Sequence, residues 1–590
     1  MRYLRMLSNS LAGGAIGAAY LVVLLLQLNP ELSLRPANLG PLYLALGITY
    51  GLHLAVAFYV LIVVRQLLAT EVDSPRWISF GLLTWLSTVA ASAAATLMWL
   101  NLQTFGPMLV ADTARRMTTG AGWMTACAGL FLVLALVHYS FGRRGSRVAS
   151  ALSVLTLIAS LSLPLVARGF GIQPAAPVRA PGVKVGLPAN PPPRVVIVAI
   201  DGASLNFIDM AAAEGRLPNF GKILDGGASM HLATIRPTQP GPVWTAVATG
   251  KLPTKNGVRS AARYHAGGSE AFEVLPDYCF SHALVRFGII VEQAHTASAL
   301  RALPIWDIVS DLGISVGVVG WPLSYPVHAI NGYMVSDQLR AMTDLTVEAD
   351  EAALVHPPEA AAVARSVLES IQMQRGGLNS GSVPGLAGAD QATIRRDLFG
   401  VDLFYDEVSN ALQAEGSPQV VAIRYRGLDT AGHYFLRYAD PRSFGDVTSE
   451  ERRAFGEVLP SAYAIVDSLL GRALASLGPD DLLLVVSGFG MEPLGVGKRL
   501  LERALGNGQL SGTHEHAPDG FLLAYGGAVE PGRRSRASVV DVVPTLLYFF
   551  GLPVAHDMDG YARTDIFRRS FTEPRPITFI PTYERLMPPG

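Results

Sequence analysis

The sequence predicts an α/β doubly wound sheet flanked by helices, preceded by a five-helix transmembrane region. Half of the 590 residues are hydrophobic and only 16% are charged, which is too apolar for an ordinary soluble protein. The long apolar runs all lie before residue 169. After residue 193, short β-branched apolar runs alternate with amphipathic segments, the pattern of a buried sheet covered by helices.

The N-terminal region contains five apolar runs long enough to span a bilayer. They lack polar faces, which excludes a helical bundle in water, and the first is followed too closely by others to be a cleaved signal peptide. The runs cover residues 8–28, 41–64, 77–100, 120–141 and 148–168.

Arginine placement predicts the orientation of residues 1–168. With the N-terminus in the cytoplasm, the inner segments carry more arginines than the outer loops, as the positive-inside rule requires. Five crossings then place everything after residue 168 outside the cytoplasm. The inner set is Arg2, Arg5, Arg65, Arg76, Arg143, Arg144 and Arg147, and the outer set is Arg35, Arg115 and Arg116.

A Pro/Gly-rich linker over residues 169–193 leads to an extracytoplasmic domain over residues 194–570. Within this domain, residues 340–400 are more polar and more helical, and we expect an insertion or a substrate cap there. Residues 571–590 form a C-terminal tail. Strands buried on both faces are predicted at 194–200, 315–321, 420–425 and 482–488.

Charge and cysteine content exclude several classes of function. The formal net charge is −1 and no basic patch with interleaved aromatic residues occurs, which argues against nucleic-acid binding. The two cysteines, Cys127 and Cys279, lie far apart in unlike surroundings, so neither a disulfide nor a cysteine-based zinc cluster is expected.

Carboxylates and imidazoles follow the predicted strands, where sites gather in open α/β sheets. Asp201 directly follows the first strand, Asp429 and His433 follow the third, and His514 lies in "SGTHEHAPDG". Together they could hold zinc or a similar divalent ion. The alternative for Asp429, His433 and His514 is an ion-paired or hydrogen-bonded trio without a metal.

Several long motifs in order resemble the alkaline phosphatase superfamily, and more narrowly the type I phosphodiesterase/nucleotide pyrophosphatase family. The resemblance spans roughly residues 194–565. It rests on "VVIVAIDGA", "RPTQPGPVWTAVATGKLPTKNGV", "PIWDIVSDLGISVGVVGWPLSYP", "RYRGLDTAGHYF", "SGTHEHAPDGFLLAYG" and "DVVPTLLYFFGLPVAHDMDG".

The resemblance implies two metal half-sites around a Thr or Ser nucleophile. One half-site takes an Asp and two His, which Asp429, His433 and His514 match. The other takes the first-strand carboxylate, matched by Asp201, and the Asp-His of an S-D-H-G turn. This turn is here Ser487-Gly488-Phe489-Gly490, and the nucleophile position is Pro240.

These departures predict one bound divalent ion rather than two, with zinc as the expected metal. Two-metal phosphoryl transfer needs two ions about 3.5–4 Å apart, and Pro240 has no hydroxyl to act as a nucleophile. Thr238 is the candidate substitute nucleophile, with a loop hydrogen-bonder or helix cap as the alternative. Glu492 and His516 are further candidates for rescue, and both also suit a solvated surface.

The expected protein is therefore a membrane-anchored, phosphodiesterase-like protein of low or no activity that binds phosphorylated envelope or lipid-linked ligands. The alternatives are a single-metal phosphodiesterase using Asp429, His433 and His514, and a head-group phosphotransferase using Thr238. The plan of five spans followed by a domain also resembles lipoteichoic acid synthases and phosphoethanolamine transferases. This analogy is the reason for expecting substrates at the membrane surface.

Overall fold

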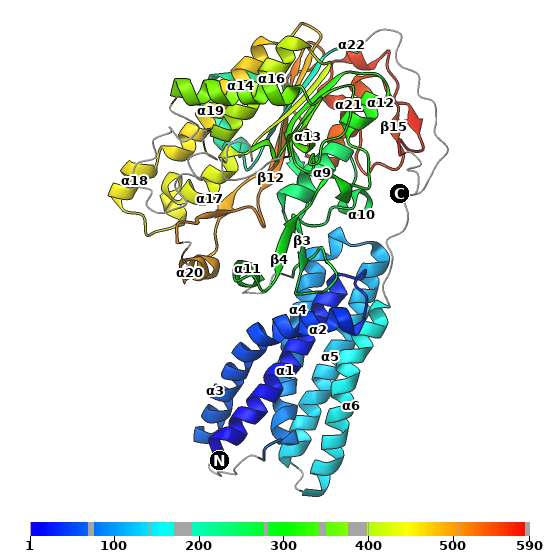
Figure 1. Ribbon diagram of the computed structural model, residues 1–590, viewed down its shortest axis with the longest axis vertical. Helices are drawn as coiled ribbons and strands as arrows, with labels where there is room; N and C mark the ends of the chain where they lie inside the picture. The colour runs from blue at the N-terminus through cyan, green and yellow to red at the C-terminus, as the bar shows by residue number, and fades with distance from the viewer. Residues whose placement is uncertain are drawn as a thin grey trace. The chain divides into compact units, whose positions relative to one another are not determined.

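The computed structural model describes residues 2–68, 76–140, 143–169, 192–276, 281–340, 350–375, 398, 400–504, 506 and 508–584 (Figure 1). The chain forms two compact units. The first, here called the helical unit, comprises Met1–Ala176 together with Ala262–Ala294. The second, the sheet unit, comprises Pro177–Ala261 and His295–Gly590.

Long helices cover all five apolar runs of the helical unit. The helix α2 continues through a π-helical turn at Gly47–Gly51 into α3. The helices are α1 (Arg2–Leu28), α2 (Pro36–Leu46), α3 (Leu52–Leu68), α4 (Phe80–Phe105), α5 (Ala111–Ser140) and α6 (Arg143–Arg168). Six helical stretches in the described part of the chain are long and apolar enough to cross a membrane. The sixth, Ser449–Ala475, belongs to the sheet unit.

Small and hydroxyl-bearing residues hold these helices together. A Cβ atom on Gly14 of α1 would lie 2.2 Å from the carbonyl oxygen of Gly51, so only glycine allows this approach. The Tyr20 hydroxyl lies 2.8 Å from Ser160 Oγ, which joins α1 to α6 inside the bundle. Buried hydrogen bonds of this kind satisfy polar atoms where no water is at hand.

The sheet unit is built on one mixed sheet of ten strands with a parallel centre. Its order is β13-β2-β12-β9-β1-β8-β5-β6-β7, with β14 paired to β2. All the pairs between β9 and β6 are parallel, and β12 and β7 join antiparallel. The main strands are β1 (Val195–Ile200), β2 (Ala228–Ala233), β5 (Val316–Trp321), β6 (Gly332–Ser336), β7 (Val355–His356), β8 (Val420–Tyr425), β9 (Leu482–Phe489) and β12 (Asp519–Gly526).

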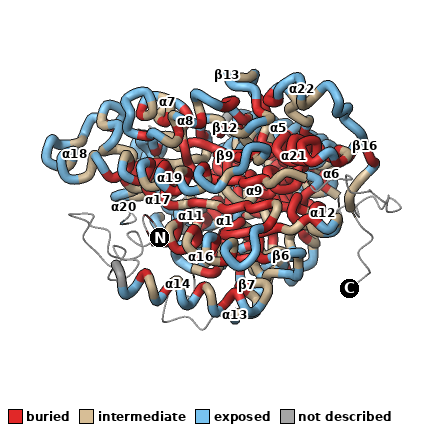
Figure 2. The backbone as a smooth tube through the Cα atoms, turned by 90° about the horizontal axis from the view of Figure 1, so that it is seen from above, coloured by how far each residue is buried: buried red, intermediate tan, exposed pale blue. Residues whose placement is uncertain are grey.

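The predicted α/β fold is confirmed, because the four strands read from the sequence form adjacent parallel strands at the centre of this sheet. Every residue of β1, β5 and β9 is buried, as expected for strands covered on both faces (Figure 2). Val195 lies opposite Val420 on one side and Leu482 on the other, so these three strands begin together.

Helices cover both faces of the sheet (Figure 1). One face carries a large apolar core under α7 (Leu205–Ala213), α8 (Pro218–Gly226), α14 (Ala360–Arg375), α16 (Val401–Glu415), α17 (Gly427–Ala439) and α19 (Val458–Ala475). In α19, the residues Val466, Leu469, Leu470 and Leu474 are buried in this core, with Ile465 at its margin. The other face carries α9 (Pro240–Thr249), α12 (Ile305–Asp311) and α21 (Val542–Phe549).

Two segments predicted as appendages are integral to the sheet unit in their described parts. Within residues 340–400, β7 extends the sheet and Ala364 and Leu368 of α14 lie in the core. Residues 341–349, 376–397 and 399 lie outside the described part. In the predicted tail, β16 (Phe579–Ile580) pairs with β15 (Val554–Ala555).

Candidate metal site

The helix α17 carries two of the predicted ligands. Asp429 lies in its first turn and His433 one turn later, so their side chains share a face. Asp402 fixes the start of this helix, because its carboxylate accepts hydrogen bonds of 2.8 Å from the backbone N–H groups of Arg426 and Gly427. Burial raises the pKa of Asp402 to about 6, although the two N–H groups favour its charged form.

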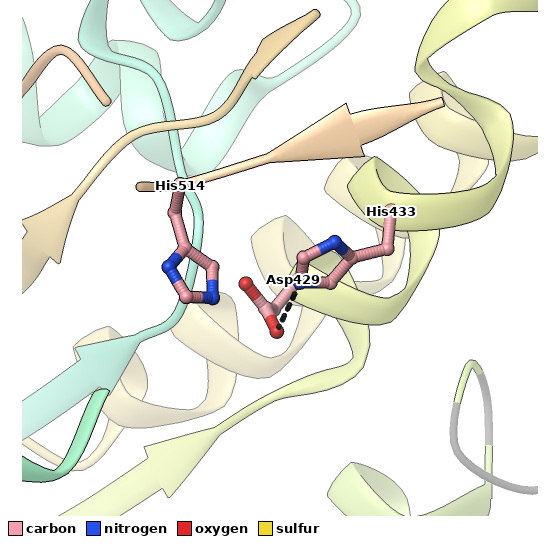
Figure 3. Close-up of side chains that lie close together, drawn as sticks. All are labelled: Asp429, His433 and His514. Carbon is pink, nitrogen blue, oxygen red and sulfur yellow. Dashed lines mark ion pairs between the residues drawn. The ribbon is translucent and has the colours of Figure 1, made fainter. Parts of the chain in front are cut away.

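The third ligand, His514, follows a short strand on the other side of the site (Figure 3). This strand, β11 (Gly512–Thr513), pairs with β10 (Glu492–Pro493) just beyond β9. His433 Nδ1 donates to the carbonyl oxygen of Gly512 at 2.9 Å. His514 Nδ1 donates to the carbonyl oxygen of Thr238 at 3.1 Å. Because both Nδ1 atoms are used as donors, the neutral form of each imidazole has its lone pair on Nε2, where a metal ion could bind.

The three side chains have the spacing of a metal site. Asp429, His433 and His514 each offer an atom within 4.8 Å of the other two. The distance from His433 Nε2 to Asp429 Oδ2 is 3.5 Å. Two ligands of a tetrahedral zinc ion lie about 3.3 Å apart, given zinc–ligand bonds near 2.0–2.1 Å. The residues present therefore suit a divalent ion.

A second observation points to a cation at the same place. The buried Oδ1 atom of Asp429 has no hydrogen-bond partner among the residues that the structure describes. A buried carboxylate oxygen without a partner is costly unless a cation is bound to it. Gly202 makes room for this carboxylate, since its φ is +69° and a Cβ there would lie 3.2 Å from Asp429 Oδ1. Three protein ligands leave one coordination position open, as catalytic sites do.

The charges of the trio support one another in the metal-free protein. Burial alone would raise the pKa of Asp429, but the neighbouring imidazoles of His433 and His514 outweigh it and lower the pKa to about 2. Burial alone would lower the pKa of His433, and the Asp429 carboxylate outweighs this and raises it. The carboxylate is therefore charged and ready to accept a cation.

Asp201, the fourth predicted ligand, is paired with Arg424, a residue that the sequence analysis did not single out. Arg424 Nε donates to Asp201 Oδ1 at 2.9 Å, and its Nη2 pairs with Oδ2. Only 2% of the Asp201 side chain is exposed. Burial would lower the pKa of Arg424, but Asp201 and its other acidic neighbours raise it. Arg424 is the one charged residue in the apolar strand "VVAIRY". A charge inside a buried strand calls for a partner, and this was the feature of the sequence that could have indicated the pairing with Asp201.

Aromatic side chains fill the region of the altered turn. Phe489 is fully buried, with its ring centroid 5.0 Å from that of His514 and 6.4 Å from that of Trp244. Trp244 in turn packs on Trp321 at 5.5 Å. A Cβ atom on Gly488 would lie 2.4 Å from Val243 Cγ1. An aspartate side chain therefore has no room at residue 488 in this packing.

The nucleophile position and its candidate substitute lie at the start of α9. Pro240 is the first residue of this helix. Thr238 is buried, its backbone N–H donates to the carbonyl oxygen of Glu515 at 3.1 Å, and its carbonyl oxygen orients His514. Its hydroxyl has no hydrogen-bond partner in the described part of the chain.

The two other candidates for rescue have structural roles. The Glu492 carboxylate accepts a hydrogen bond of 2.9 Å from the backbone N–H of His516, which fastens β10 to the loop that carries His514. His516 itself is exposed. The cluster of possible metal ligands consists of Asp429, His433 and His514, and it includes neither Glu492 nor His516.

An α/β sheet with acidic and imidazole side chains beyond the carboxyl ends of its parallel strands is the arrangement in which α/β proteins commonly place a metal site. The family model for type I phosphodiesterase / nucleotide pyrophosphatase matches residues 195–542. The chain belongs to this family, within the alkaline phosphatase superfamily.

Solved structures show distant likeness to the chain. Murine ectonucleotide pyrophosphatase / phosphodiesterase 5 is 13% identical with a TM-score of 0.36, covering 64% of this chain and 100% of its own. A mutant of the alkaline phosphatase PafA is 12% identical with a TM-score of 0.39, covering 65% and 100%. No curated protein matches the chain.

Proposed function

We propose that the sheet unit binds a phosphorylated ligand at a single divalent ion, zinc in the first instance, held by Asp429, His433 and His514. Turnover is slow or absent. The orientation of both imidazoles, with each Nδ1 donating to a backbone carbonyl oxygen, is the observation that carries this proposal. A bound ion would supply Lewis-acid polarisation of a phosphoryl oxygen.

Three features of the chain support one ion rather than two. Asp201 is already paired with Arg424, the space beside Gly488 holds Val243, and Phe489 brings a hydrocarbon ring where the resemblance implies an imidazole. A dipositive ion together with one extra carboxylate at residue 488 would carry a net charge of plus one. One guanidinium carries the same charge, so Arg424 keeps the site electrostatically similar without a second metal.

The second candidate function is a single-metal phosphodiesterase or head-group transferase. Two features favour this second function: the coordination position that three protein ligands would leave open, and the buried Thr238 hydroxyl, which has no hydrogen-bond partner among the described residues. Zinc and manganese titrations of the purified chain, followed by assay on a generic aryl phosphodiester, separate the two functions. Turnover of about 1 s⁻¹ or more would establish the second.

Replacing Thr238 by valine tests whether its hydroxyl reacts. Under the binding proposal, Thr238→Val leaves zinc affinity within about twofold and raises the free energy of unfolding by roughly 1 kcal/mol, because a buried hydroxyl without a partner is removed. Urea unfolding and calorimetry measure both. Thr245→Val is the matched control: its hydroxyl donates to Gly241 at 2.7 Å, so this variant loses stability. Loss of residual turnover in Thr238→Val alone would make Thr238 the nucleophile.

We also propose that residues 192–584 lie outside the cytoplasm, where the ligand is a lipid-linked or envelope phosphate. The arginine asymmetry of residues 1–168 and the apolar helices of the helical unit support this placement.

A reporter that fluoresces only in the cytoplasm tests the orientation. Fused after Gly590 it is expected to stay dark, and fused after Leu68, at the end of α3, it is expected to be bright. Cell fluorescence normalised to the amount of fusion protein gives the comparison. A bright fusion at Gly590 would reverse the orientation and remove the envelope ligand from the proposal.

A further inference from the structure

A segment in the middle of the phosphodiesterase sequence folds with the helical unit. Residues 262–294 belong to that unit, although the chain on both sides of them belongs to the sheet unit. The segment contains β3 (Ala262–His265) and β4 (Val291–Ala294), which pair antiparallel with Ala262 opposite Ala294. The chain therefore passes between the two units at three places: after residue 176, after 261 and after 294.

Asn29, just after α1, binds this segment through its side chain. It is fully buried, and its Nδ2 donates to the carbonyl oxygens of Val274 at 2.8 Å and Leu25 at 3.0 Å. Its Oδ1 accepts from the backbone N–H groups of Val274 at 2.8 Å and Glu273 at 3.2 Å. One amide thus satisfies backbone groups of two segments, as a neighbouring strand would.

A second contact lies beside the first. The backbone N–H of Glu270 donates to Asn38 Oδ1 at 2.9 Å. The Glu270 carboxylate accepts from Ser33 Oγ at 3.0 Å and from the Ser33 backbone N–H at 3.2 Å. Between these polar contacts, Phe272 is fully buried. Its ring centroid lies 6.0 Å from that of Tyr264 in the same segment, so the contact with the helices shown here is made by hydrogen bonds.

Helix α6, the last helix of the helical unit, binds the loop after α1 that carries Asn29 and Ser33. Arg168, at the end of α6, is 1% exposed. Its Nε donates to the carbonyl oxygen of Leu26 at 2.6 Å, and its Nη2 donates to those of Asn29 at 2.8 Å and Leu32 at 2.5 Å. The guanidinium therefore fixes the chain just before Ser33, which gives the segment a preformed partner.

The segment begins one residue after a contact with the site loop. The backbone N–H of Ala261 donates to Gln239 Oε1 at 2.6 Å, and Gln239 lies between Thr238 and Pro240. A Cβ atom on Gly241 would lie 3.3 Å from the carbonyl oxygen of Ser260, so the start of α9 packs closely on the backbone just before the segment. Thr238 in turn orients His514.

We propose that residues 262–294 are a second attachment of the phosphodiesterase sequence to the helical unit, held by Asn29 and Asn38 independently of the 169–193 linker. The helices then do more than anchor the chain. They hold a segment whose first residue directly follows Ala261, the residue that contacts Gln239.

Cleavage of the linker in the folded, full-length chain tests this attachment. A site for a specific protease is inserted between Ala180 and Pro181, and the detergent-purified protein is cut to completion. A tag at the N-terminus is expected to retain the C-terminal fragment. The double variant Asn29→Ala/Asn38→Ala loses several buried hydrogen bonds, so its ratio of released to retained fragment should rise about tenfold or more.

The control is Asn101→Ala, because Asn101 is a buried asparagine of α4 whose side chain donates to Leu97 of its own helix. Its released fraction should match that of the parent protein. Release of the fragment from the parent protein, or equal retention by the parent and the double variant, would overturn the proposal.

A second measurement avoids variants that weaken the fold. Cysteines replace Ser33 and Glu270, whose side chains are in contact, and a short bis-maleimide is added before the linker is cut. The two fragments should then migrate as one band on a denaturing gel. The pair Asn101→Cys/Glu270→Cys should give two bands. Two bands from the Ser33/Glu270 pair would contradict the attachment.

Discussion

Replacing His514 by alanine is expected to remove the bound ion. His514 supplies one of three ligands, and its Nε2 lone pair is set by the hydrogen bond from Nδ1 to Thr238. Loss of even an outer-shell partner lowers metal affinity by about 10–100-fold, so loss of a ligand should cost more than about 100-fold. Calorimetric titration of the metal-free chain with zinc measures the change.

The matched control for this variant is His516→Ala. His516 is exposed, lies two residues from His514 and is not one of the three clustered ligands. Zinc affinity should stay within about twofold of that of the parent protein. If His514→Ala retained full affinity while His516→Ala lost it, the ligand set proposed here would be wrong.

Introducing the residues that the resemblance implies for a second half-site is not expected to add a second ion unless the local packing is also changed. The variant Pro240→Thr/Gly488→Asp/Phe489→His should still bind one ion, because Val243 stands where the new carboxylate would lie and Arg424 still holds Asp201. Valine has little rotamer freedom with which to move aside. Exchange of the fully buried Phe489 should also lower the free energy of unfolding by about 3 kcal/mol.

Adding Val243→Gly and Arg424→Ala to this variant is expected to admit the second ion and to raise phosphodiester hydrolysis strongly, since nucleophile and ions act as a unit. The number of bound ions and the rate of hydrolysis of an aryl phosphodiester are compared between the triple variant and the variant with all five substitutions. Phe489→Leu is the control for the packing loss alone. A second ion bound by the set that keeps Val243 and Arg424 would show that these residues do not block the site.

The sequence was sufficient to predict the fold of the sheet unit and the proximity of Asp429, His433 and His514. Asp429 and His433 are four residues apart on one helix, so their proximity is local, and both follow a predicted strand. The capture of Asp201 by Arg424 depends instead on strand register, which places Arg424 opposite Ala199. Register between β1 and β8 cannot be read from either strand alone.

The predicted domain boundaries missed the segment 262–294 for a similar reason. Nothing in its composition distinguishes it from the rest of residues 194–570, and the contact between Asn29 and Val274 joins residues 245 positions apart. The aromatic packing around Phe489 is equally non-local, because Trp244 and Trp321 come from α9 and β5. Neighbours of this kind follow only from the assembled fold.

The number of metal ions per chain tests the central claim most directly. The full-length protein, purified in detergent, exchanged into zinc-containing buffer and then freed of unbound metal, is analysed by inductively coupled plasma mass spectrometry against its concentration by amino-acid analysis. The arrangement of Asp429, His433 and His514, with Arg424 on Asp201, predicts one ion per chain. Two ions would show that the second half-site is intact, and none would show that the trio is a hydrogen-bonded cluster without a metal.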